Sequence, residues 1–449
     1  MSFLNFGSVS ALITRASRYL IILLMVIYTF QSYTVFRRRS PQGKRYVFLR
    51  QNICMFLIHI TAFLVLFLDS MSFELLVFYG ANVVFLLAAL ILWTNLYPRA
   101  SRLLINHMCM LTSIGFIMIA RLSFDSAVRQ FKIVAAGTAL TLIIPVIVRK
   151  ILALTKLGWA YTFVGIGLLG LVLVAARVTN GAKLSIEVGG FSFQASEFVK
   201  IIFVFAVAGL LSEANNFRRV VIATFLAAVH VLILVVSTDL GSALIFFVTY
   251  LVLLFAATRN PFLVLAGIIA GAGASVAAYF LFYHVQVRVS IWLDPFADYA
   301  GTGYQISQSL FSIAAGGWLG TGLGKGSPGT IPYVQQDFMF SAITEELGVI
   351  FALCLIFVCM SCFIMFVNVA MKLDNRFYRL VALGLGCTYA IQVFLTIGGG
   401  IKLIPMTGVT LPLVSYGGSS ALSTLAMFAI VQGLYTLRRD EEIKDEKER

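Results

Sequence analysis

The sequence has few charged residues: 12% of its 449 residues are Asp, Glu, Lys or Arg, whereas 60% are apolar. An average soluble protein has about 25% charged and about 45–50% apolar residues. So little charge cannot cover a soluble particle of 49.3 kDa, which excludes a cytosolic enzyme and a disordered chain. The apolar residues form long unbroken runs, which also excludes a membrane β-barrel with its short alternating strands. The composition therefore predicts an all-α polytopic membrane protein.

Cysteine and histidine are also scarce, with six and four residues in the whole chain. None of them is grouped at metal-ligand spacing, so both types are interpreted as buried packing residues. Acidic residues number 19 against 33 basic ones, which gives a net charge of +14. Because no basic patch is interleaved with aromatic residues, nucleic acid is not expected as a partner. The basic excess is instead expected in cytoplasmic loops, beside membrane lipid.

The apolar residues gather in thirteen runs that approach the length of about 20 residues that a bilayer-spanning helix needs. The predicted spans are residues 19–36, 53–69, 73–97, 103–120, 132–148, 157–176, 196–211, 220–236, 239–257, 261–283, 339–370, 378–398 and 409–437. One connection, residues 284–338, is far longer than the others, and loops of such length are usually functional or disordered. Its aromatic residues, among them Trp292 and Trp318, predict that it is ordered against the membrane.

The distribution of Lys and Arg predicts the orientation. One set of alternate loops holds 22 basic residues and the other holds 11. The richer side is expected to face the cytoplasm, which places the C-terminus inside and the N-terminus outside the membrane. Arg15 and Arg18 oppose this assignment for the first span. Residues 438–449 are almost wholly charged and are expected to form a disordered cytoplasmic tail.

Charged residues inside or beside apolar spans are functional candidates, because an unpaired charge is costly in a membrane. Glu197 and Lys200 are three residues apart, which places them on one helix face as an ion pair. They either face an internal cavity or anchor a helix end. Asp239 precedes a span and is interpreted mainly as a helix cap. Asp337 ends the long external loop, where it is either a cap or a reactive group at the water–membrane border.

Further candidates lie near Asp337. Glu345 and Glu346 follow it within the next span and either line the same cavity or bind a neighbouring helix. The external basic residues of this region could bind an anionic lipid head group, especially a pyrophosphate, or could simply lie at the interface. These basic residues are Lys183, Arg288, Lys325 and Lys402.

Five segments, in order, resemble the SEDS family, whose members include FtsW, RodA and SpoVE. They include the Asp-Phe-Met-Phe run that begins at Asp337 and the Gly-Gly-Ser-Ser run that contains Ser419. The segments are residues 180–200, 237–243, 292–310, 316–348 and 405–420. The resemblance implies a core of ten transmembrane helices over residues 103–437, with 284–338 as the extracellular loop before the eighth. Residues 1–102, with about three helices, are then an N-terminal extension.

The resemblance also implies a function. SEDS proteins are peptidoglycan glycosyltransferases that polymerise lipid II on the outer face of the cytoplasmic membrane, during division, elongation or sporulation. Their partner is a class B penicillin-binding protein. Asp337 matches the family's catalytic aspartate, and Glu197 and Lys200 match its Glu/Lys pair.

Chemistry assigns roles to these residues. Asp337 would act as the general base that accepts a proton from the attacking sugar hydroxyl. Lys183, Arg288, Lys325 and Lys402 would stabilise the pyrophosphate leaving group. Asp239, Glu345, Glu346 and Ser419 would support the site. A divalent cation, Mg²⁺ or Mn²⁺, is plausible at the pyrophosphate although no ligand cluster is visible; no soluble cofactor is needed.

The sequence departs from the family pattern at two places near the candidate site, Leu184-Ser185 and Gln335-Gln336. These departures leave open whether the chain serves division, elongation or sporulation. Two other functions are also alternatives, on separate grounds. The many spans would suit a lipid II flippase or transporter, although no internal repeat is apparent. The apolar helices would also suit a non-catalytic scaffold for a penicillin-binding protein.

Overall fold

The computed structural model describes residues 6–38, 40–150, 152–175, 185–188, 191–213 and 217–448. Apart from one antiparallel hairpin, β1 (Ile186–Val188) and β2 (Phe191–Phe193), its regular elements are helices, as predicted. The helices are α1 (Phe6–Arg37), α2 (Pro41–Ser70), α3 (Phe73–Leu96), α4 (Arg102–Leu122), α5 (Phe124–Thr141), α6 (Ile144–Lys150), η1 (Leu152–Lys156), α7 (Gly158–Ala175), α8 (Ala195–Ser212), α9 (Phe217–Val236), α10 (Leu240–Thr258), α11 (Pro261–Leu281), α12 (Tyr283–Leu293), α13 (Tyr304–Gly316), η2 (Pro328–Thr330), α14 (Met339–Met371), α15 (Arg376–Gly400) and α16 (Gly418–Glu448).

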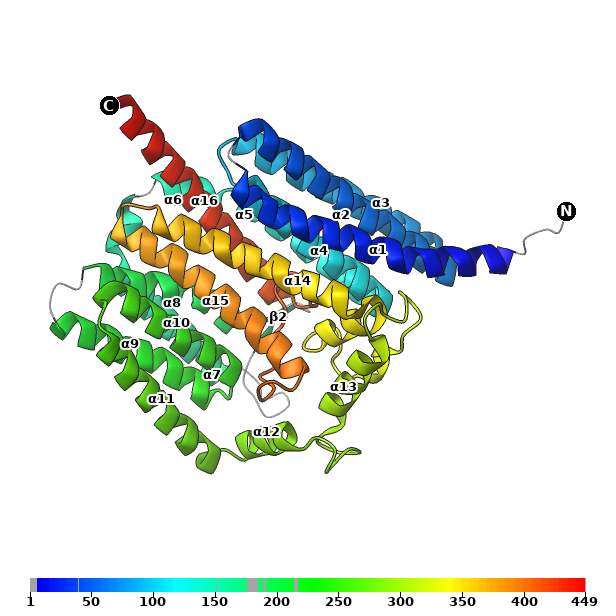
Figure 1. Ribbon diagram of the computed structural model, residues 1–449. Coiled ribbons are helices and arrows are strands. Elements are labelled where there is room, and N and C mark those ends of the chain that lie inside the picture. Colours follow the sequence, from blue (N-terminus) through cyan, green and yellow to red (C-terminus); the bar gives the residue numbers. More distant parts are fainter. Residues whose placement is uncertain are drawn as a thin grey trace.

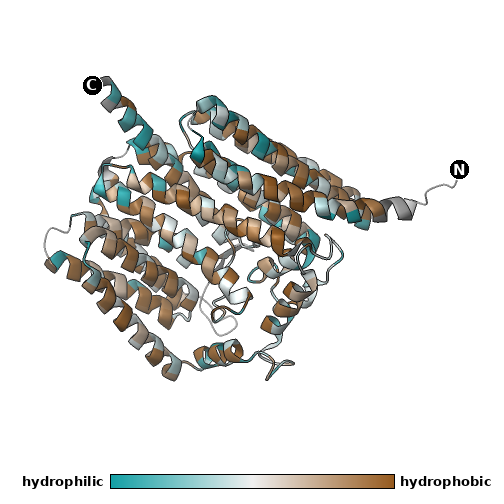
Figure 2. Ribbon diagram, viewed as in Figure 1, coloured by the Kyte–Doolittle hydropathy of each residue, from teal (hydrophilic) through white to brown (hydrophobic). Residues whose placement is uncertain are grey.

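Within the described residues, thirteen helical segments are long and apolar enough to cross a membrane, one for each predicted run. They lie roughly side by side as a bundle, with the C-terminus at one end and α13 near the other (Figure 1). Hydrophilic residues gather toward the ends of the helices and along the last part of α16 (Figure 2). This distribution fits a multi-pass membrane protein, because only the ends of its helices meet water.

The centre of the bundle is formed by α4, α15 and α16. In the most apolar stretch of each helix, 94%, 78% and 78% of the residues are buried. The first three helices lie to one side, where α1 packs against α2 and α14, and α2 packs against α4. On the opposite side, α11 has no buried residue and contacts mainly α10 and α12. Helix α3 contacts both α4 and α5, so the N-terminal helices are packed onto the bundle mainly through α4, α5 and α14.

The second core span differs from the prediction. It begins at Phe124, eight residues earlier than predicted, and its helix is interrupted between Thr141 and Ile144. Pro145 explains the interruption, because its ring clashes with the carbonyl group four residues before it and it has no backbone N–H to donate.

The prediction of a span over 409–437 is wrong at its start, because α16 begins only at Gly418. Residues 409–417 are irregular although Leu411, Leu413 and Val414 are buried. Side chains satisfy the backbone groups that a helix would otherwise pair. Gln392 Nε2 donates to the Thr410 carbonyl oxygen (3.1 Å), Thr396 Oγ1 donates to that of Val409 (2.8 Å), and Leu411 N donates to Ser415 Oγ (3.0 Å). Irregular backbone is tolerated at membrane depth only when protein surrounds it in this way.

The long connection 284–338 is ordered, as its aromatic content predicts, and it contains α12, α13 and η2. α13 packs against α14. Ser309 on α13 joins both α14 and α15, since its hydroxyl lies 2.6 Å from Ser341 Oγ and donates to the Gly400 carbonyl oxygen (2.7 Å). These contacts fix the connection against the end of the bundle at which Asp337 lies.

The prediction of a disordered C-terminal tail is wrong, because α16 continues to Glu448. Ion pairs explain its helical order. Glu442 pairs with Arg438 (2.6 Å) and Arg439 (2.9 Å) along one face, and Asp440 pairs with both Arg99 and Arg149. Opposite charges three and four residues apart stabilise a helix, and the contacts with Arg99 and Arg149 attach the tail to the bundle.

Candidate functional site

Asp337 lies in a tight turn immediately before α14. Its backbone N–H donates to the Tyr333 carbonyl oxygen (3.2 Å), and Tyr333 itself has a positive φ of 57°. Tyr416 N donates to the Gln335 carbonyl oxygen (2.7 Å), which joins this turn to the irregular segment before α16. The half-buried Asp337 carboxylate faces Gly408, where an added Cβ would lie 3.9 Å from Oδ2. Among the hydrogen bonds of the described residues, none involves that carboxylate, so it is available to a ligand.

Two of the predicted cations line one cavity beside this turn. The cavity has a volume of about 220 Å³ and is lined by Arg288 and Trp292 of α12, and by Lys402 and Met406 of the segment after α15. Arg288 Nη1 donates to the Met406 carbonyl oxygen (3.2 Å), and Lys402 Nζ donates to that of Leu293 (3.2 Å). The structure therefore brings Arg288 and Lys402 together on a cavity of the size that a sugar or a pyrophosphate would occupy.

Electrostatics connects this cavity to Asp337. Burial raises the pKa of the Asp337 carboxyl group from 3.8 to about 6, and the nearby Arg288 charge opposes this rise. Burial likewise lowers the pKa of Arg288, while the charges of Asp337 and Asp239 oppose that change. A carboxylate with a raised pKa is a better base than an ordinary aspartate and is still ionised at neutral pH.

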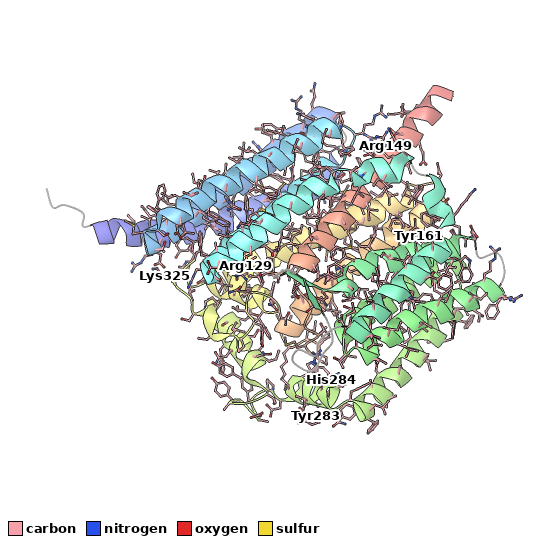
Figure 3. All side chains as sticks on the ribbon, turned by 180° about the vertical axis from the view of Figure 1, so that it is seen from behind. Arg129, Arg149, Tyr161, Tyr283, His284 and Lys325 are labelled. Atoms are coloured by element: carbon pink, nitrogen blue, oxygen red, sulfur yellow. The ribbon has the colours of Figure 1, made fainter. Side chains whose placement is uncertain are left out.

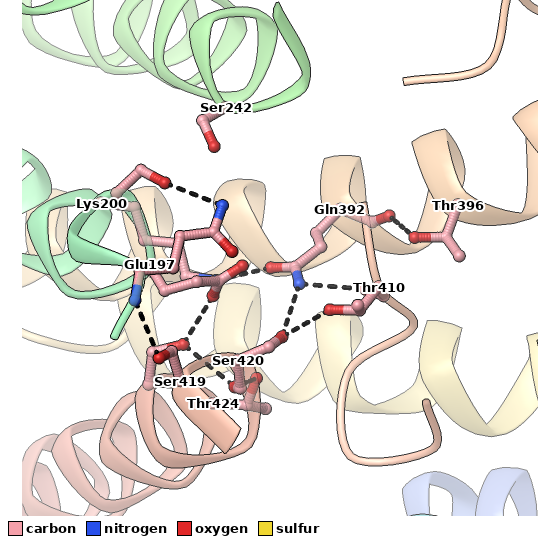
Figure 4. Close-up of polar contacts among 12 residues, drawn as sticks. Glu197, Lys200, Ser242, Gln392, Thr396, Thr410, Ser419, Ser420 and Thr424 are labelled. Carbon is pink, nitrogen blue, oxygen red and sulfur yellow. Dashed lines mark hydrogen bonds and ion pairs between the residues drawn. The ribbon is translucent and has the colours of Figure 1, made fainter. Parts of the chain in front are cut away.

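Glu197 and Lys200 form the ion pair that their spacing predicts, and both side chains are buried. The pair is part of a larger polar network that joins α8, α15 and α16 (Figure 4). Lys200 Nζ also donates to Gln392 Oε1 (2.7 Å), and Ser423 Oγ donates to Glu197 Oε2 (2.8 Å). Because each charge has further hydrogen-bond partners, the cost of burying the pair is partly offset.

Gln392 connects this network to the segment that faces Asp337. Its amide nitrogen donates to the Thr410 carbonyl oxygen (3.1 Å) and to Ser420 Oγ (3.3 Å), and Thr410 Oγ1 donates to Ser420 Oγ (2.8 Å). Gly408, which faces the catalytic candidate, is two residues before Thr410 and has a φ of 74°, a conformation that favours glycine. The Glu197–Lys200 pair therefore reaches Asp337 indirectly, through Gln392 and this segment.

The supporting residues Asp239 and Ser419 have defined structural roles. Asp239 caps α10, as predicted, since its Oδ1 accepts a hydrogen bond from Ser242 N (3.1 Å). Its other oxygen accepts one from Ser196 Oγ of α8 (2.8 Å). Ser419 Oγ accepts from Gln194 N and donates to the Ser192 carbonyl oxygen, both at 3.1 Å, so it ties the start of α16 to β2 and to the start of α8.

Glu346 binds a neighbouring helix, the second of the two alternatives above, whereas Glu345 binds the connection just before η2. Glu346 pairs with Arg121 of α4 (3.0 Å), and Glu345 Oε1 accepts from Ser327 N (2.7 Å). Their carbonyl oxygens accept hydrogen bonds from the glycine-rich segment 316–326. The segment lies against α14 at Gly348, where the helix is interrupted and φ is 84°. There the backbone nitrogens of Val349 and Ile350 donate to the carbonyl oxygens of Gly317 and Trp318. A side chain at Gly348 would clash, because an added Cβ would lie 2.5 Å from the Gly320 nitrogen.

Lys325 is not brought to the cavity beside Asp337. It forms an ion pair with Asp69 at the end of α2 (2.8 Å), and both side chains are about half exposed. Lys325 lies at the end of the bundle opposite that of Arg149 (Figure 3). Arg18 of α1 contacts the same glycine-rich segment, donating to the Gly320 carbonyl oxygen (2.8 Å). Helices α1 and α2 therefore both hold this segment. Lys183, the remaining predicted cation, lies outside the described residues, as does Leu184.

Three residues of this region were not predicted from the sequence: Gln392, Arg121 and Gly348. A glutamine within a predicted span was a signal for Gln392, since uncharged polar side chains in membranes also need partners. Arg121 directly follows a predicted span and could have been matched to an acidic residue, but its partner is 225 residues away. In the described residues there is no group of three or more His, Cys, Asp or Glu that could hold a metal ion.

Comparison with known proteins decides the family. The FtsW/RodA/SpoVE family, described as cell cycle proteins, matches residues 101–440. The peptidoglycan glycosyltransferase RodA of Mycobacterium tuberculosis is 36% identical over 363 residues, which cover 74% of this chain and 77% of that protein. The chain belongs to the FtsW/RodA/SpoVE family. The resemblance identified from the sequence segments is thereby confirmed.

Other members of the FtsW/RodA/SpoVE family agree with this assignment. The probable peptidoglycan glycosyltransferase FtsW of Halorhodospira halophila is 32% identical and covers 76% of this chain and 90% of its own. A chain of a solved peptidoglycan synthase complex has a TM-score of 0.65 and 26% identity, covering 76% of this chain and 98% of that one. RodA of Thermus thermophilus shares the fold, with a TM-score of 0.57, 24% identity and coverage of 76% and 97%. The family match begins at Ser101, the N-cap of α4, so α1, α2 and α3 precede it.

Proposed function

We propose that the chain is a peptidoglycan glycosyltransferase that polymerises lipid II into glycan strands on the outer face of the cytoplasmic membrane, in division, elongation or sporulation. The named relatives are peptidoglycan glycosyltransferases. The observation that carries the proposal is the position of Asp337. It is a carboxylate with no hydrogen-bond donor among the described residues, it has a raised pKa, and it lies beside a cavity with two cations.

Asp337 acts as the general base in this proposal. The hydroxyl oxygen of the acceptor sugar attacks the anomeric carbon of the lipid-linked donor, and its proton passes to the Asp337 carboxylate. The bond between the anomeric carbon and the pyrophosphate oxygen breaks, and the polyprenyl pyrophosphate leaves with the bonding electrons. General-base catalysis by a positioned carboxylate accelerates such a step by typically 10²–10⁴-fold.

Arg288 and Lys402 stabilise the leaving group. Negative charge develops on the pyrophosphate as the bond breaks, and cations already fixed beside it lower the barrier. Arg288 is suited to this role because its planar guanidinium can donate two parallel hydrogen bonds to phosphate oxygens. Its hydrogen bond to the Met406 carbonyl oxygen holds it on the cavity wall. A Mg²⁺ or Mn²⁺ ion would take its ligands from the pyrophosphate oxygens, because the described residues hold no group of three or more His, Cys, Asp or Glu that could bind it, and it would add positive charge beside the leaving group.

The partner that we propose is a class B penicillin-binding protein. A solved relative comes from a peptidoglycan synthase complex in which polymerisation and crosslinking are coordinated. The apolar faces of the bundle offer a membrane-embedded contact surface, against which a membrane-spanning helix of the partner would pack. This chain would supply the glycan strand, and the partner would crosslink it.

Purified protein in detergent, with fluorescent lipid II and with or without its penicillin-binding partner, tests the proposal. Glycan strands resolved on a gel are expected, and a chelator arm tests the proposed divalent cation. Lipid II that crosses proteoliposome membranes without forming strands would instead indicate a flippase. An absence of both strands and transport, with the partner's own activity increased, would indicate a scaffold.

A further inference from the structure

A second cavity lies between the N-terminal helices and the core, far from Asp337. Its volume is about 510 Å³, and it is lined by residues of α2, α3 and α4. It opens at the end of the bundle where α2 and α4 begin and α3 ends, the same end at which Arg99 pairs with Asp440 near the C-terminus. Nothing in the proposed glycosyl transfer uses it.

The lining of this cavity changes from charged to aliphatic with depth. Arg45 and Arg102 line its outer part, within the first turns of α2 and α4. Leu49 and Ile105 follow them by four and three residues, which places them about 6 Å and about 4.5 Å deeper on the same helix faces. Leu90 and Ile91 of α3 complete the aliphatic wall. A cavity with cations at the membrane surface and apolar walls below it matches an amphiphile with an anionic head group.

The two arginines are free to bind such a head group. Both are exposed, and among the ion pairs of the described residues neither takes part in one. Arg50 is different, because its guanidinium lies 4.3 Å from the centre of the Tyr46 ring and donates to the Tyr46 hydroxyl. The segment 37–50 contains six basic residues and no acidic one, so the potential around the opening is positive. Asn52, deeper on α2, presents a side-chain amide that can donate to an ester carbonyl oxygen.

We propose that this cavity is a binding site for an anionic phospholipid. Arg45 and Arg102 bind its phosphate, and one acyl chain lies along Leu49, Leu90, Ile91 and Ile105. The basic loops at this end predict that it faces the cytoplasm, where anionic lipids attract basic segments near the membrane surface. The lipid would fill the space between α2, α3 and α4 and so join the N-terminal helices to the core.

Native mass spectrometry of the full chain in detergent, titrated with phosphatidylglycerol or phosphatidylcholine, tests this proposal. One phosphatidylglycerol is expected to bind at least tenfold more tightly than phosphatidylcholine. The R45Q/R102Q variant should lose this preference, whereas R37Q/K44Q, which removes two charges of the same region outside the cavity lining, should change the affinity less than twofold. Leu49→Trp, which fills the cavity and keeps both charges, should also weaken binding at least tenfold.

The proposal is overturned if R45Q/R102Q binds phosphatidylglycerol as the wild type does, or if both lipids bind equally. It is also overturned if millimolar inorganic phosphate displaces the lipid, since the site would then bind a free anion. Melting temperatures measured without added lipid check the fold of each variant. If the double variant does not fold, Leu49→Trp and the single substitutions decide the outcome by the same criteria.

Discussion

Glu197 and Lys200 are joined by a buried ion pair whose partners are one helical turn apart on α8, and Gln392 of α15 accepts a second hydrogen bond from Lys200. Through Gln392, the pair also fixes the irregular segment that contains Gly408, against which the Asp337 carboxylate lies. The pair thus has a structural role in positioning the wall of the site, separate from the chemistry of the reaction.

Removing one partner of this pair should destabilise the protein strongly. Lys200→Met leaves the buried Glu197 carboxylate without its cation, which costs about 3–5 kcal/mol in comparable buried pairs. The double variant Glu197→Gln with Lys200→Met leaves no buried charge and should regain most of that loss. Thermal unfolding in detergent measures both. A double variant no more stable than Lys200→Met would show that the two charges do not depend on each other.

The activity of the enzyme should depend on the ionisation of Asp337. Burial raises the pKa of Asp337 to about 6, and only the ionised form can accept a proton, so kcat/KM should rise with pH through about 6. Arg288 favours the ionised form. Arg288→Gln should therefore move the rise in kcat/KM to higher pH, whereas Arg288→Lys should keep that rise near pH 6. A pH profile unchanged by Arg288→Gln would show that the guanidinium does not act on Asp337.

The interruption of α14 at Gly348 should tolerate no side chain. Gly348→Ala adds a Cβ 2.5 Å from both the Gly320 nitrogen and the Trp318 carbonyl oxygen, at a φ of 84°. The combined strain and clash should cost more than about 1–3 kcal/mol, the usual cost of an unfavourable backbone conformation alone. Gly170→Ala is the matched control, since nothing lies within 4 Å of its added Cβ. Equal melting temperatures for the two variants would contradict the described path of segment 316–326.

The ion pair between Lys325 and Asp69 should contribute little to overall stability. Both side chains are about half exposed, and exposed pairs contribute under about 1 kcal/mol. Lys325→Ala should therefore leave the melting temperature nearly unchanged and should reduce polymerisation less than Arg288→Ala does. A loss of polymerisation as large as that of Arg288→Ala would show that Lys325 does contribute to pyrophosphate binding.

The sequence was sufficient to predict the helical segments, the Glu197–Lys200 pair and the cap formed by Asp239, because each depends on residues near one another in the chain. It could not predict that 409–417 is irregular. That segment is as apolar as a helix, and several of its backbone groups are satisfied by residues far away in the chain, among them the Gln392 and Thr396 side chains of α15 and the Gln335 carbonyl oxygen.

The partners of the candidate charges were the least predictable part of the site. Lys325 and Arg288 both lie in the long connection, yet one binds α2 and the other lines the cavity beside Asp337. Glu346 is only nine residues after Asp337, yet it points to Arg121. The partner that each charged side chain binds depends on the helix interruption at Gly348 and on how the N-terminal helices pack. Neither feature can be predicted from the spacing of nearby residues.

The central claim is that Asp337 is the general base of a lipid II polymerase. Polymerisation by the Asp337→Asn variant tests it most directly, with Asp374→Asn, the same change at an exposed position, as the control. Asp337→Asn should lose at least about 10²-fold in the rate of strand formation while it still folds and binds lipid II, and Asp374→Asn should keep the wild-type rate. Strands formed by Asp337→Asn at the wild-type rate would show that Asp337 is not the general base.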